Sequence, residues 1–509
     1  MSEAPLLSIK NLSLGYHATT VVSNISLSIA PGELVTIMGG NGCGKSTLLK
    51  AIAARATSSE NNTNGNDLCW EGHLALRPAL SLAYLPQVGL SGRELEGKAN
   101  HSLLFRTAAR FGLVLDEIEP DRLSEGQRQK LSLASVLACD ADLILLDEPT
   151  NFLDLGGVDG FEQMVIRQKQ RGCGFLLVTH DRSLADNLAD RTLLISANGI
   201  YSVEGGYSAA WSLKTTDYES RQRQAADIKR KMDQLQADAR RRSTWAANKE
   251  KTKKGAKLEK PHIAKMAKKM AARSKAVEMR AERARKDLEK VKPFVPKTVN
   301  LKIEPYTVRH RTFVRLDRVD FDYMPDRRPP LLKQLSFELS TASKTCLLGA
   351  NGAGKTTLLN LILGKLKPLR GNIHRNGNVS AVYLPQGLKG VFDNGSLLDN
   401  MGLGHHDETQ VRQYLGAALL RRDKVTEAVE RFSPGELMRA AVVRCLLDKA
   451  EFMILDEPTS NLDIESIEVL EHLLQEFPGG FLLISHDRSF VQNIARQLIV
   501  IENGELSLM

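Results

Sequence analysis

The chain carries the same succession of motifs twice. GGNGCGKST at 39–47 returns as GANGAGKTT at 349–357, and LILLDEPTNFLD at 143–154 returns as FMILDEPTSNLD at 452–463. The motifs YLPQ and HDRS also recur in the same order, and the two copies of each motif are separated by 299 to 310 residues. A duplication of this kind predicts two similar domains in one chain.

We place copy one at residues 7–206 and copy two at 308–509, with a third segment at 207–307 between them. Within each copy, short apolar stretches such as LVTIM, LILL and FLLV alternate with stretches typical of helices. This alternation predicts the α/β class, with a mainly parallel sheet and helices on its faces.

The third segment has a different pattern. Apolar or small residues recur every seven positions from Trp211 to Ala246, and a second series of this kind runs from Ile263 to Val291. Gly255 and Pro261 lie between the two series, so we expect an antiparallel helical hairpin. Each arm of about 30 residues would extend roughly 45 Å.

Positive charge is concentrated in this segment. Residues 221–298 hold 26 Lys and Arg against 9 Asp and Glu, whereas the whole chain has a net charge of +9. The remainder is therefore acidic, and the pattern favours an anionic polymer such as nucleic acid as partner. The alternative is a solvated helix face. The lysines expected at the tip of the hairpin, as RNA contacts, are Lys249, Lys251, Lys253, Lys254, Lys257 and Lys260.

Composition excludes several classes of protein. The chain is 42% hydrophobic and has no apolar run near the roughly 20 residues that span a bilayer, so a membrane-embedded protein is not expected. The first residues, MSEAPLLSIK, do not resemble a secretion leader. The six cysteines form no CxxC pair, which favours a reducing cytoplasm over disulfides or iron–sulfur clusters.

The repeated GxxxxGK[ST] motif predicts two phosphate-binding loops, because each copy follows an apolar strand and precedes a helical stretch. The glycines allow backbone N–H groups to approach phosphates, and Lys45 and Lys355 neutralise them. Ser46 and Thr356 are expected to supply a hydroxyl to Mg²⁺.

Carboxylates follow the apolar strands LILL and MIL. We expect Asp147 and Asp456 to hold Mg²⁺ and the adjacent Glu148 and Glu457 to polarise an attacking water. Two further pairs are expected to act with these acids: Gln87 and Gln386 on the metal and the water, and His180 and His486 on the γ-phosphate. A histidine of this kind, taken alone, is more often structural, but its repetition in both copies favours the contact to phosphate.

The motifs LSEGQ at 123–127 and FSPGE at 432–436 are one further pair that recurs in the same order in both copies. With them the sequence resembles the ATP-binding-cassette ATPases, and the resemblance covers about 400 residues. It implies that the two cassettes pair head to tail within one monomer, so that each ATP lies between the phosphate loop of one and the LSGGQ-like signature of the other. It also implies that Tyr16 and Tyr323 stack on adenine, although each could be a residue at the edge of the core.

The resemblance and the motifs together give one set of residues expected to contact ATP. They are Tyr16, Gly39, Asn41, Gly42, Gly44, Lys45, Ser46, Thr47, Ser124, Gly126, Gln127, Tyr323, Gly349, Asn351, Gly352, Gly354, Lys355, Thr356, Thr357, Ser433, Gly435 and Glu436.

Among tandem cassettes without membrane segments, the chain is most similar to the ABC-F translation factors. Their long basic linker implies a cytoplasmic partner, the ribosome, with binding at the exit site and contacts to rRNA and P-site tRNA near the peptidyl-transferase centre. No membrane subunit is then expected. The other hypothesis is a tandem importer ATPase, the energy-coupling subunit of a membrane transporter. Within ABC-F, housekeeping translation factors and antibiotic-resistance proteins both remain open.

One departure from the family pattern affects the expected activity. Pro434 replaces a glycine of the second signature, which removes a backbone N–H and fixes φ. By the head-to-tail pairing, this signature covers the ATP held by Lys45. We therefore expect the two ATP sites to be unequal.

Overall fold

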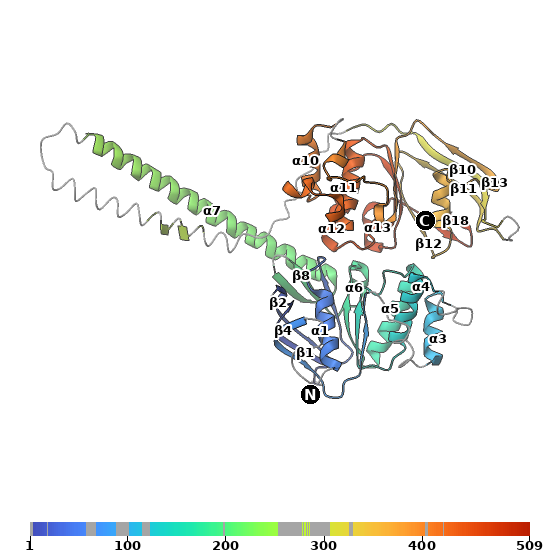
Figure 1. Ribbon diagram of the computed structural model, residues 1–509, viewed down its shortest axis with the longest axis horizontal. Coiled ribbons are helices and arrows are strands. Elements are labelled where there is room, and N and C mark those ends of the chain that lie inside the picture. Colours follow the sequence, from blue (N-terminus) through green and yellow to red (C-terminus); the bar gives the residue numbers. More distant parts are fainter. Residues whose placement is uncertain are drawn as a thin grey trace. The chain divides into compact units, whose positions relative to one another are not determined.

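The computed structural model describes residues 4–17, 19–57, 68–87, 101–113, 123–196, 199–252, 277, 279–280, 282–283, 285, 306–324, 329–402, 406–420 and 422–508. The chain forms two compact units. One unit holds both copies, and the other consists mainly of residues 211–295. The ribbon in Figure 1 shows each copy as a sheet with helices packed against it.

A six-stranded, mainly parallel sheet forms the centre of each copy. The strand order is β5-β6-β7-β3-β8-β9 in copy one and β14-β15-β16-β12-β17-β18 in copy two. In copy one the strands are β3 (Leu34–Gly39), β5 (Leu82–Leu85), β6 (Leu143–Asp147), β7 (Gly174–Val178), β8 (Arg191–Ser196) and β9 (Gly199–Glu204). In copy two they are β12 (Lys344–Gly349), β14 (Ala381–Leu384), β15 (Phe452–Asp456), β16 (Gly480–Ile484), β17 (Gln497–Glu502) and β18 (Glu505–Leu508).

Central strands such as β6 and β7 are buried along their whole length because both faces of the sheet are covered. In β6, Leu143 and Leu145 belong to one hydrophobic core and Ile144 and Leu146 to the other. The helices of copy one are α1 (Lys45–Thr57), α3 (His101–Arg110), α4 (Glu125–Leu137), α5 (Leu155–Gln170) and α6 (Arg182–Leu188). Those of copy two are α9 (Lys355–Ile362), α10 (Glu408–Ala417), α11 (Pro434–Leu447), α12 (Ile464–Glu476) and α13 (Arg488–Ile494). The predicted α/β class with two similar domains is confirmed.

Each copy also contains a three-stranded antiparallel sheet, which the sequence analysis missed. Its strand order is β2-β1-β4 in copy one and β11-β10-β13 in copy two. The strands are β1 (Leu7–Tyr16), β2 (Thr19–Ile29), β4 (Leu68–Leu76), β10 (Thr312–Phe321), β11 (Leu332–Ser340) and β13 (Arg370–Arg375). The connection between β1 and β2 is too short for the crossover that two parallel strands need. The short spacing of these two strands along the chain could therefore have predicted an antiparallel pair.

The third segment begins with α7, a single helix that spans Tyr207–Thr252. Its 46 residues correspond to about 69 Å, so it is longer than the predicted arm and includes the first residues of the predicted tip. Heptad residues such as Tyr218, Ala225 and Met232 are only half-exposed, as expected for a packed stripe. Most of the predicted return arm lies outside the described residues, as do Lys253, Lys254, Lys257 and Lys260 of the tip. The hairpin therefore stays a prediction.

Candidate active site

Sheet order brings the repeated motifs together. In copy one, Gln87, Asp147, His180 and the phosphate loop lie at the carboxyl ends of β5, β6, β7 and β3, four neighbouring strands. The parallel registers place Asp147 beside Val178, and Gly39 at the last pairing of β3 with β8. Crevices at the carboxyl ends of such sheets are the usual binding sites of α/β proteins.

The two phosphate loops have the geometry that their glycines allow. Gly42 and Gly44 have φ of 76° and 97°, in the left-handed region that favours glycine. The ammonium of Lys45 donates to the carbonyls of Gly39 at 2.8 Å and Gly40 at 3.0 Å. Lys355 makes the same pair of contacts in copy two. Each loop is thus closed around its own lysine at the N-terminus of α1 or α9.

The glutamates that follow β6 and β15 have a strained backbone. Glu148 has φ of 51° and Glu457 has φ of 49°, values that residues with a side chain rarely adopt. Their N–H groups donate to the carbonyls of Val178 and Ile484, both at 2.9 Å. Such strain, repeated at the same position in both copies and beside the phosphate loops, is of the kind found at functional sites.

Each glutamate lies beside a histidine. His180 Nε2 is 3.4 Å from Glu148 Oε1, and His486 Nε2 is 3.3 Å from Glu457 Oε1. Burial raises the pKa of Glu148 to about 8 and that of Glu457 to about 7. Burial also lowers the pKa of His180 to about 3 and that of His486 to about 4. Burial therefore shifts both members of each pair toward their neutral forms.

Asp147 and Ser46 fit a magnesium ion. Asp147 Oδ1 is buried and has no hydrogen-bond donor among the described residues, while the Ser46 side chain is within hydrogen-bond reach of this carboxylate. Burial raises the pKa of Asp147, a cost that a bound cation would remove. In copy two, the hydroxyl of Tyr383 donates to Asp456 at 3.3 Å. Carboxylate and hydroxyl oxygens are the ligands that Mg²⁺ prefers.

The copies contact each other head to tail at these loops. The N–H of Asn351 donates to Asp154 at 2.9 Å, and the N–H of Asn41 donates to Asp463 at 3.2 Å. The two aspartates are the N-caps of α5 and α12, directly after the DEPT motifs. The phosphate loop of each copy thus meets the helix that follows the carboxylates of the other.

One cavity of about 1380 Å³ lies between the copies and is lined by both phosphate loops. Of the residues expected to act at ATP, the cavity brings together Asn41, Gly42, Gly44, Lys45, Ser46, Thr47, Gln87, Ser124, Gly126, Gln127, Asp147, Glu148, His180, Tyr323, Asn351, Gly352, Gly354, Lys355, Thr356, Thr357, Gln386, Asp456, Glu457 and His486. Its described lining does not include Tyr16, Gly39, Gly349, Ser433, Gly435 or Glu436, although Pro434 contributes to it.

The signature motifs begin helices. Ser124 caps α4 in a reciprocal pair with Gln127, and Ser433 caps α11 in the same way with Glu436. Pro434 is the first residue of α11, where a proline fits because the helix needs no N–H there. Burial alone would raise the pKa of Glu436, but the hydrogen bonds from Lys424 and Ser433 and the charge of Lys424 together outweigh it and lower the pKa, which keeps this carboxylate ionised. Copy one has the neutral Gln127 at that position.

Comparison with known proteins agrees with this geometry. The family model described as ABC transporter matches residues 22–151 and 332–460. The ribosome protection protein VmlR of Bacillus subtilis (strain 168) is 30% identical, over 98% of this chain and 87% of its own length. The ATP-binding protein Uup of Caulobacter vibrioides is 26% identical, over 98% of this chain and 78% of its own length.

The solved structure of an RNase-L Inhibitor has the same fold, with a TM-score of 0.61 and 18% identity over 98% of this chain and 90% of that one. The fold and the paired sites define a tandem-cassette ATPase. The chain belongs to the ATP-binding cassette family, in its ABC-F group. Among the described residues, no helix is both long enough and apolar enough to cross a bilayer.

Proposed function

We propose that this chain is a cytoplasmic, ribosome-associated ATPase. In its ATP state it binds the ribosomal exit site, and its basic linker reaches rRNA and P-site tRNA near the peptidyl-transferase centre. It acts there as a translation factor or as a protein that protects ribosomes from antibiotics. The cassettes are residues 7–206 and 308–509, the linker is 207–307, and the chain works as a monomer through its own two copies.

The observation that carries the proposal is the placement of charge. The segment between two paired copies holds 26 Lys and Arg against 9 Asp and Glu, whereas the rest of the chain is acidic. Phosphate backbones attract such segments, and the attraction is largely independent of nucleotide sequence. The similarity to VmlR, whose name states ribosome protection, supports the same partner.

In this proposal each ATP site is shared. Lys45 holds the phosphates of one ATP, which Ser433 and Gly435 cover, and Lys355 holds those of the other, which Ser124 and Gly126 cover. Asp147 and Asp456, with Ser46 and Thr356, hold Mg²⁺, which supplies positive charge to the phosphates. The catalytic carboxylates orient and polarise water, and the histidines contact the γ-phosphate. The strained backbones of Glu148 and Glu457, and the histidine within 3.4 Å of each carboxylate, support these roles.

The test uses the variant Glu148→Gln with Glu457→Gln, purified as the full chain. With ATP, this variant is expected to sediment through a sucrose cushion with 70S ribosomes. A variant with Lys45→Ala and Lys355→Ala, which loses the phosphate contacts, should stay in the supernatant and serves as the control. Sedimentation with membranes in place of ribosomes would instead indicate the transporter subunit and would contradict the proposal.

A further inference from the structure

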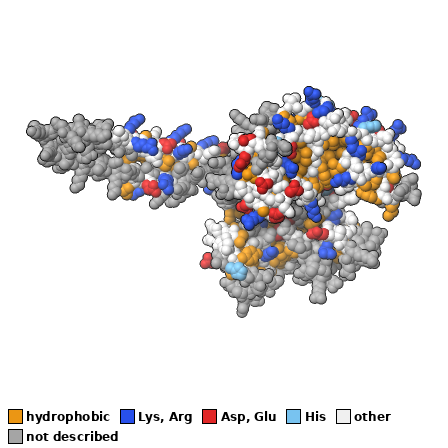
Figure 2. All heavy atoms as spheres, turned by 45° about the horizontal axis from the view of Figure 1, so that its top comes forward, with side chains coloured by type: hydrophobic (Ala, Val, Ile, Leu, Met, Phe, Trp, Pro, Cys, Tyr) orange, Lys and Arg blue, Asp and Glu red, His pale blue; other side chains and the backbone are white. Residues whose placement is uncertain are grey.

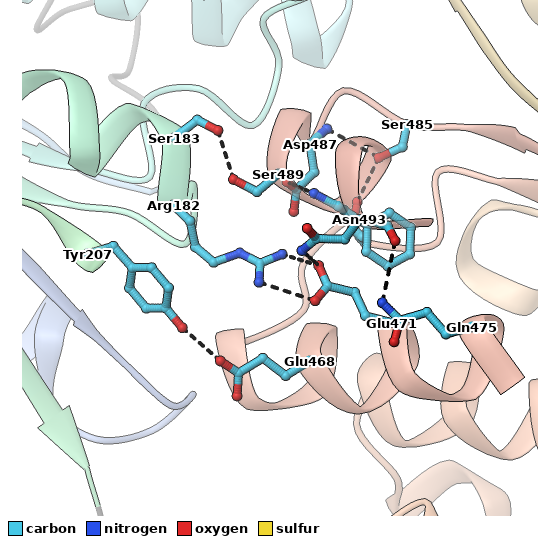
Figure 3. A network of polar contacts seen from close by, with 12 residues as sticks. Arg182, Ser183, Tyr207, Glu468, Glu471, Gln475, Ser485, Asp487, Ser489 and Asn493 are labelled. Atoms are coloured by element: carbon cyan, nitrogen blue, oxygen red, sulfur yellow. Dashed lines mark hydrogen bonds and ion pairs between the residues drawn. The ribbon is translucent and has the colours of Figure 1, made fainter. Parts of the chain in front are cut away.

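The segments after the two histidines meet near a pseudo-twofold axis. Ser183 Oγ and Ser489 Oγ lie 2.8 Å apart, and the two serines hold the same position in HDRS (Figure 3). An isologous contact pairs each surface with its own counterpart, so equivalent residues meet on the axis. The interface between the copies is therefore expected to make each contact twice.

The neighbouring arginines follow this symmetry. Arg182 binds Glu471 on α12 through two hydrogen bonds. Its counterpart Arg488 binds α5, with Nη2 2.6 Å from Asp159 and Nη1 3.6 Å from Glu162. Glu162 and Glu471 occupy equivalent positions after the DEPT motifs. Each copy therefore sends one arginine from its histidine segment to the helix of the other copy.

The symmetry ends at Glu468, which is the counterpart of Asp159. Glu468 accepts a hydrogen bond of 2.7 Å from the hydroxyl of Tyr207 (Figure 3). Tyr207 is the first residue of α7, and it is buried, with 6% of its surface exposed. Burial and the neighbouring Glu468 raise the pKa of this tyrosine, so its hydroxyl stays a donor. The start of α7 is thus bonded to copy two.

The same turn of α7 is fixed to copy one. Ser208 donates to Asp186 on α6 through its N–H at 2.8 Å and through its hydroxyl at 2.6 Å. Gly206 packs so closely that a Cβ there would lie 2.4 Å from the Cα of Asp186. Because α6 follows directly after His180 and its N-cap Asp181, a short rigid path joins this side of the active site to α7.

The contact between Tyr207 and copy two can also be traced back to a phosphate loop. Helix α12 starts after its N-cap Asp463, which accepts the N–H of Asn41, and it carries Glu468 and Glu471 in its next turns. Separation of the copies at Asn41 would move α12 as one body. The bond between Glu468 and Tyr207 would then break unless α7 moved with it.

We propose that Tyr207 is a positioning residue that ties the first turn of α7 to copy two when the copies close on ATP. The neighbouring ion pair of Arg182 and Glu471 joins the two copies beside this contact. Closure then changes the surroundings of the helix that enters the basic linker. The coupling rests on the pairing of the copies alone, whereas its effect on ribosomes rests on the proposed function.

The test is hydrogen exchange of the full chain in the background of Glu148→Gln with Glu457→Gln, with and without ATP. ATP is expected to slow exchange in the first turns of α7, around residues 207–215. The further change Tyr207→Phe should remove at least half of this slowing while α12 and both phosphate loops keep theirs. Tyr218→Phe, on the same helix but outside the contact, is the matched control and should behave like the background.

Unchanged slowing in the Tyr207→Phe variant would overturn the proposal, whether or not the protein binds ribosomes. Loss of slowing at the phosphate loops as well would also overturn it, because Tyr207 would then be needed for closure itself. A protein that couples as expected but does not sediment with ribosomes would instead contradict the proposed function and leave the coupling in place.

Discussion

The N–H of Asn351 in one phosphate loop donates to the carboxylate of Asp154 in the other copy at 2.9 Å. The equivalent contact joins Asn41 and Asp463 at 3.2 Å. Burial alone would raise the pKa of Asp154, but the N–H donors of Asn351 and Gly157 outweigh it and lower the pKa. Burial is likewise outweighed at Asp463, whose pKa is also lowered, so each aspartate stays ionised at the junction between the copies.

The first prediction concerns the water-polarising carboxylates. Glu148→Gln with Glu457→Gln should bind ATP with nearly unchanged affinity, because the phosphate loops are intact. Turnover should fall by several orders of magnitude, because the carboxylates directed at the water are gone. Steady-state phosphate release and a fluorescent ATP analogue measure the two quantities. Turnover near that of the wild type would contradict the assigned roles.

The second prediction concerns inequality between the sites. Pro434 and the ionised Glu436 belong to the signature that covers the ATP of Lys45 in the proposed pairing. Glu457→Gln alone should therefore depress turnover more than Glu148→Gln alone. If the missing N–H causes the inequality, Pro434→Gly should reduce the difference in turnover between the two single variants. If the negative charge causes it, Glu436→Gln should reduce that difference. Equal losses in the two single variants, by single-turnover hydrolysis, would show that the sites are equivalent.

The third prediction compares two pseudo-symmetric ion pairs. The side chains of Arg182 and Glu471 are only 8% and 10% exposed, whereas Asp159, which faces Arg488, is 58% exposed. Glu471→Gln leaves a buried arginine without its charge partner and should cost about 3 kcal/mol or more of folding or closure free energy. Asp159→Asn should cost less than about 1 kcal/mol. Urea unfolding with and without ATP measures both, and equal costs would contradict the difference in burial.

The fourth prediction concerns pH. Burial raises the pKa of Glu148 from 4.5 to about 8, so between these values the folded state retains a proton that the unfolded state has released. This carboxyl therefore lowers the free energy of unfolding as pH rises through that window. His180 has an opposing effect, because the unfolded state binds a proton that the folded state lacks, but this effect is largest below pH 6.5 and fades above it.

Between pH 6.5 and about 8, the free energy of unfolding of the nucleotide-free protein should consequently fall less steeply with pH in the Glu148→Gln variant than in the wild type. Urea midpoints measured at intervals across this range give the slope. Thr150→Ser, a conservative change in the neighbouring loop that adds no titrating group, is the control and should keep the slope of the wild type. The same slope in the Glu148→Gln variant would mean that this carboxyl is already ionised.

The fifth prediction concerns the linker. Replacing Lys251, Lys253, Lys254 and Lys257 by Gln should leave ribosome-free ATPase activity unchanged, because both copies are untouched. Ribosome affinity should decline, and the slope of log affinity against log salt should become shallower by roughly 0.7 to 0.9 for each lost phosphate contact. Co-sedimentation at several salt concentrations measures both. Unchanged affinity and slope would indicate that the linker is a solvated spacer.

The surface view in Figure 2 shows Lys and Arg side chains along the described part of α7. Some of these are paired along the helix, as Arg221 is with Asp217 and Arg223 with Glu219. Such exposed pairs contribute little to stability. They provide a second variant set, within α7, in which Arg221→Gln and Arg223→Gln should change the salt slope less for each charge removed than the changes at the four lysines predicted for the tip.

The sequence by itself determined the local chemistry of this protein. Repetition identified the phosphate loops and the DE pairs, because glycine, lysine and carboxylate at fixed spacing depend on contacts within a few residues. Apolar strands bounded by charge indicated the parallel sheets correctly. Heptad spacing indicated the helix that became α7, although the predicted arm of about 30 residues is shorter than the 46 residues of this helix.

Only the tertiary structure decided which distant segments of the chain lie next to each other. The strand order places the phosphate loop that follows β3 beside His180, which follows β7, although Gln87 and Asp147 lie between them along the chain, because crossovers exchange neighbours in a parallel sheet. The antiparallel sheets, the strain at Glu148 and the bond from Tyr207 to Glu468 likewise follow from packing between distant segments. No spacing along the chain encodes a contact across 261 residues, since its energy exists only once both helices are in place.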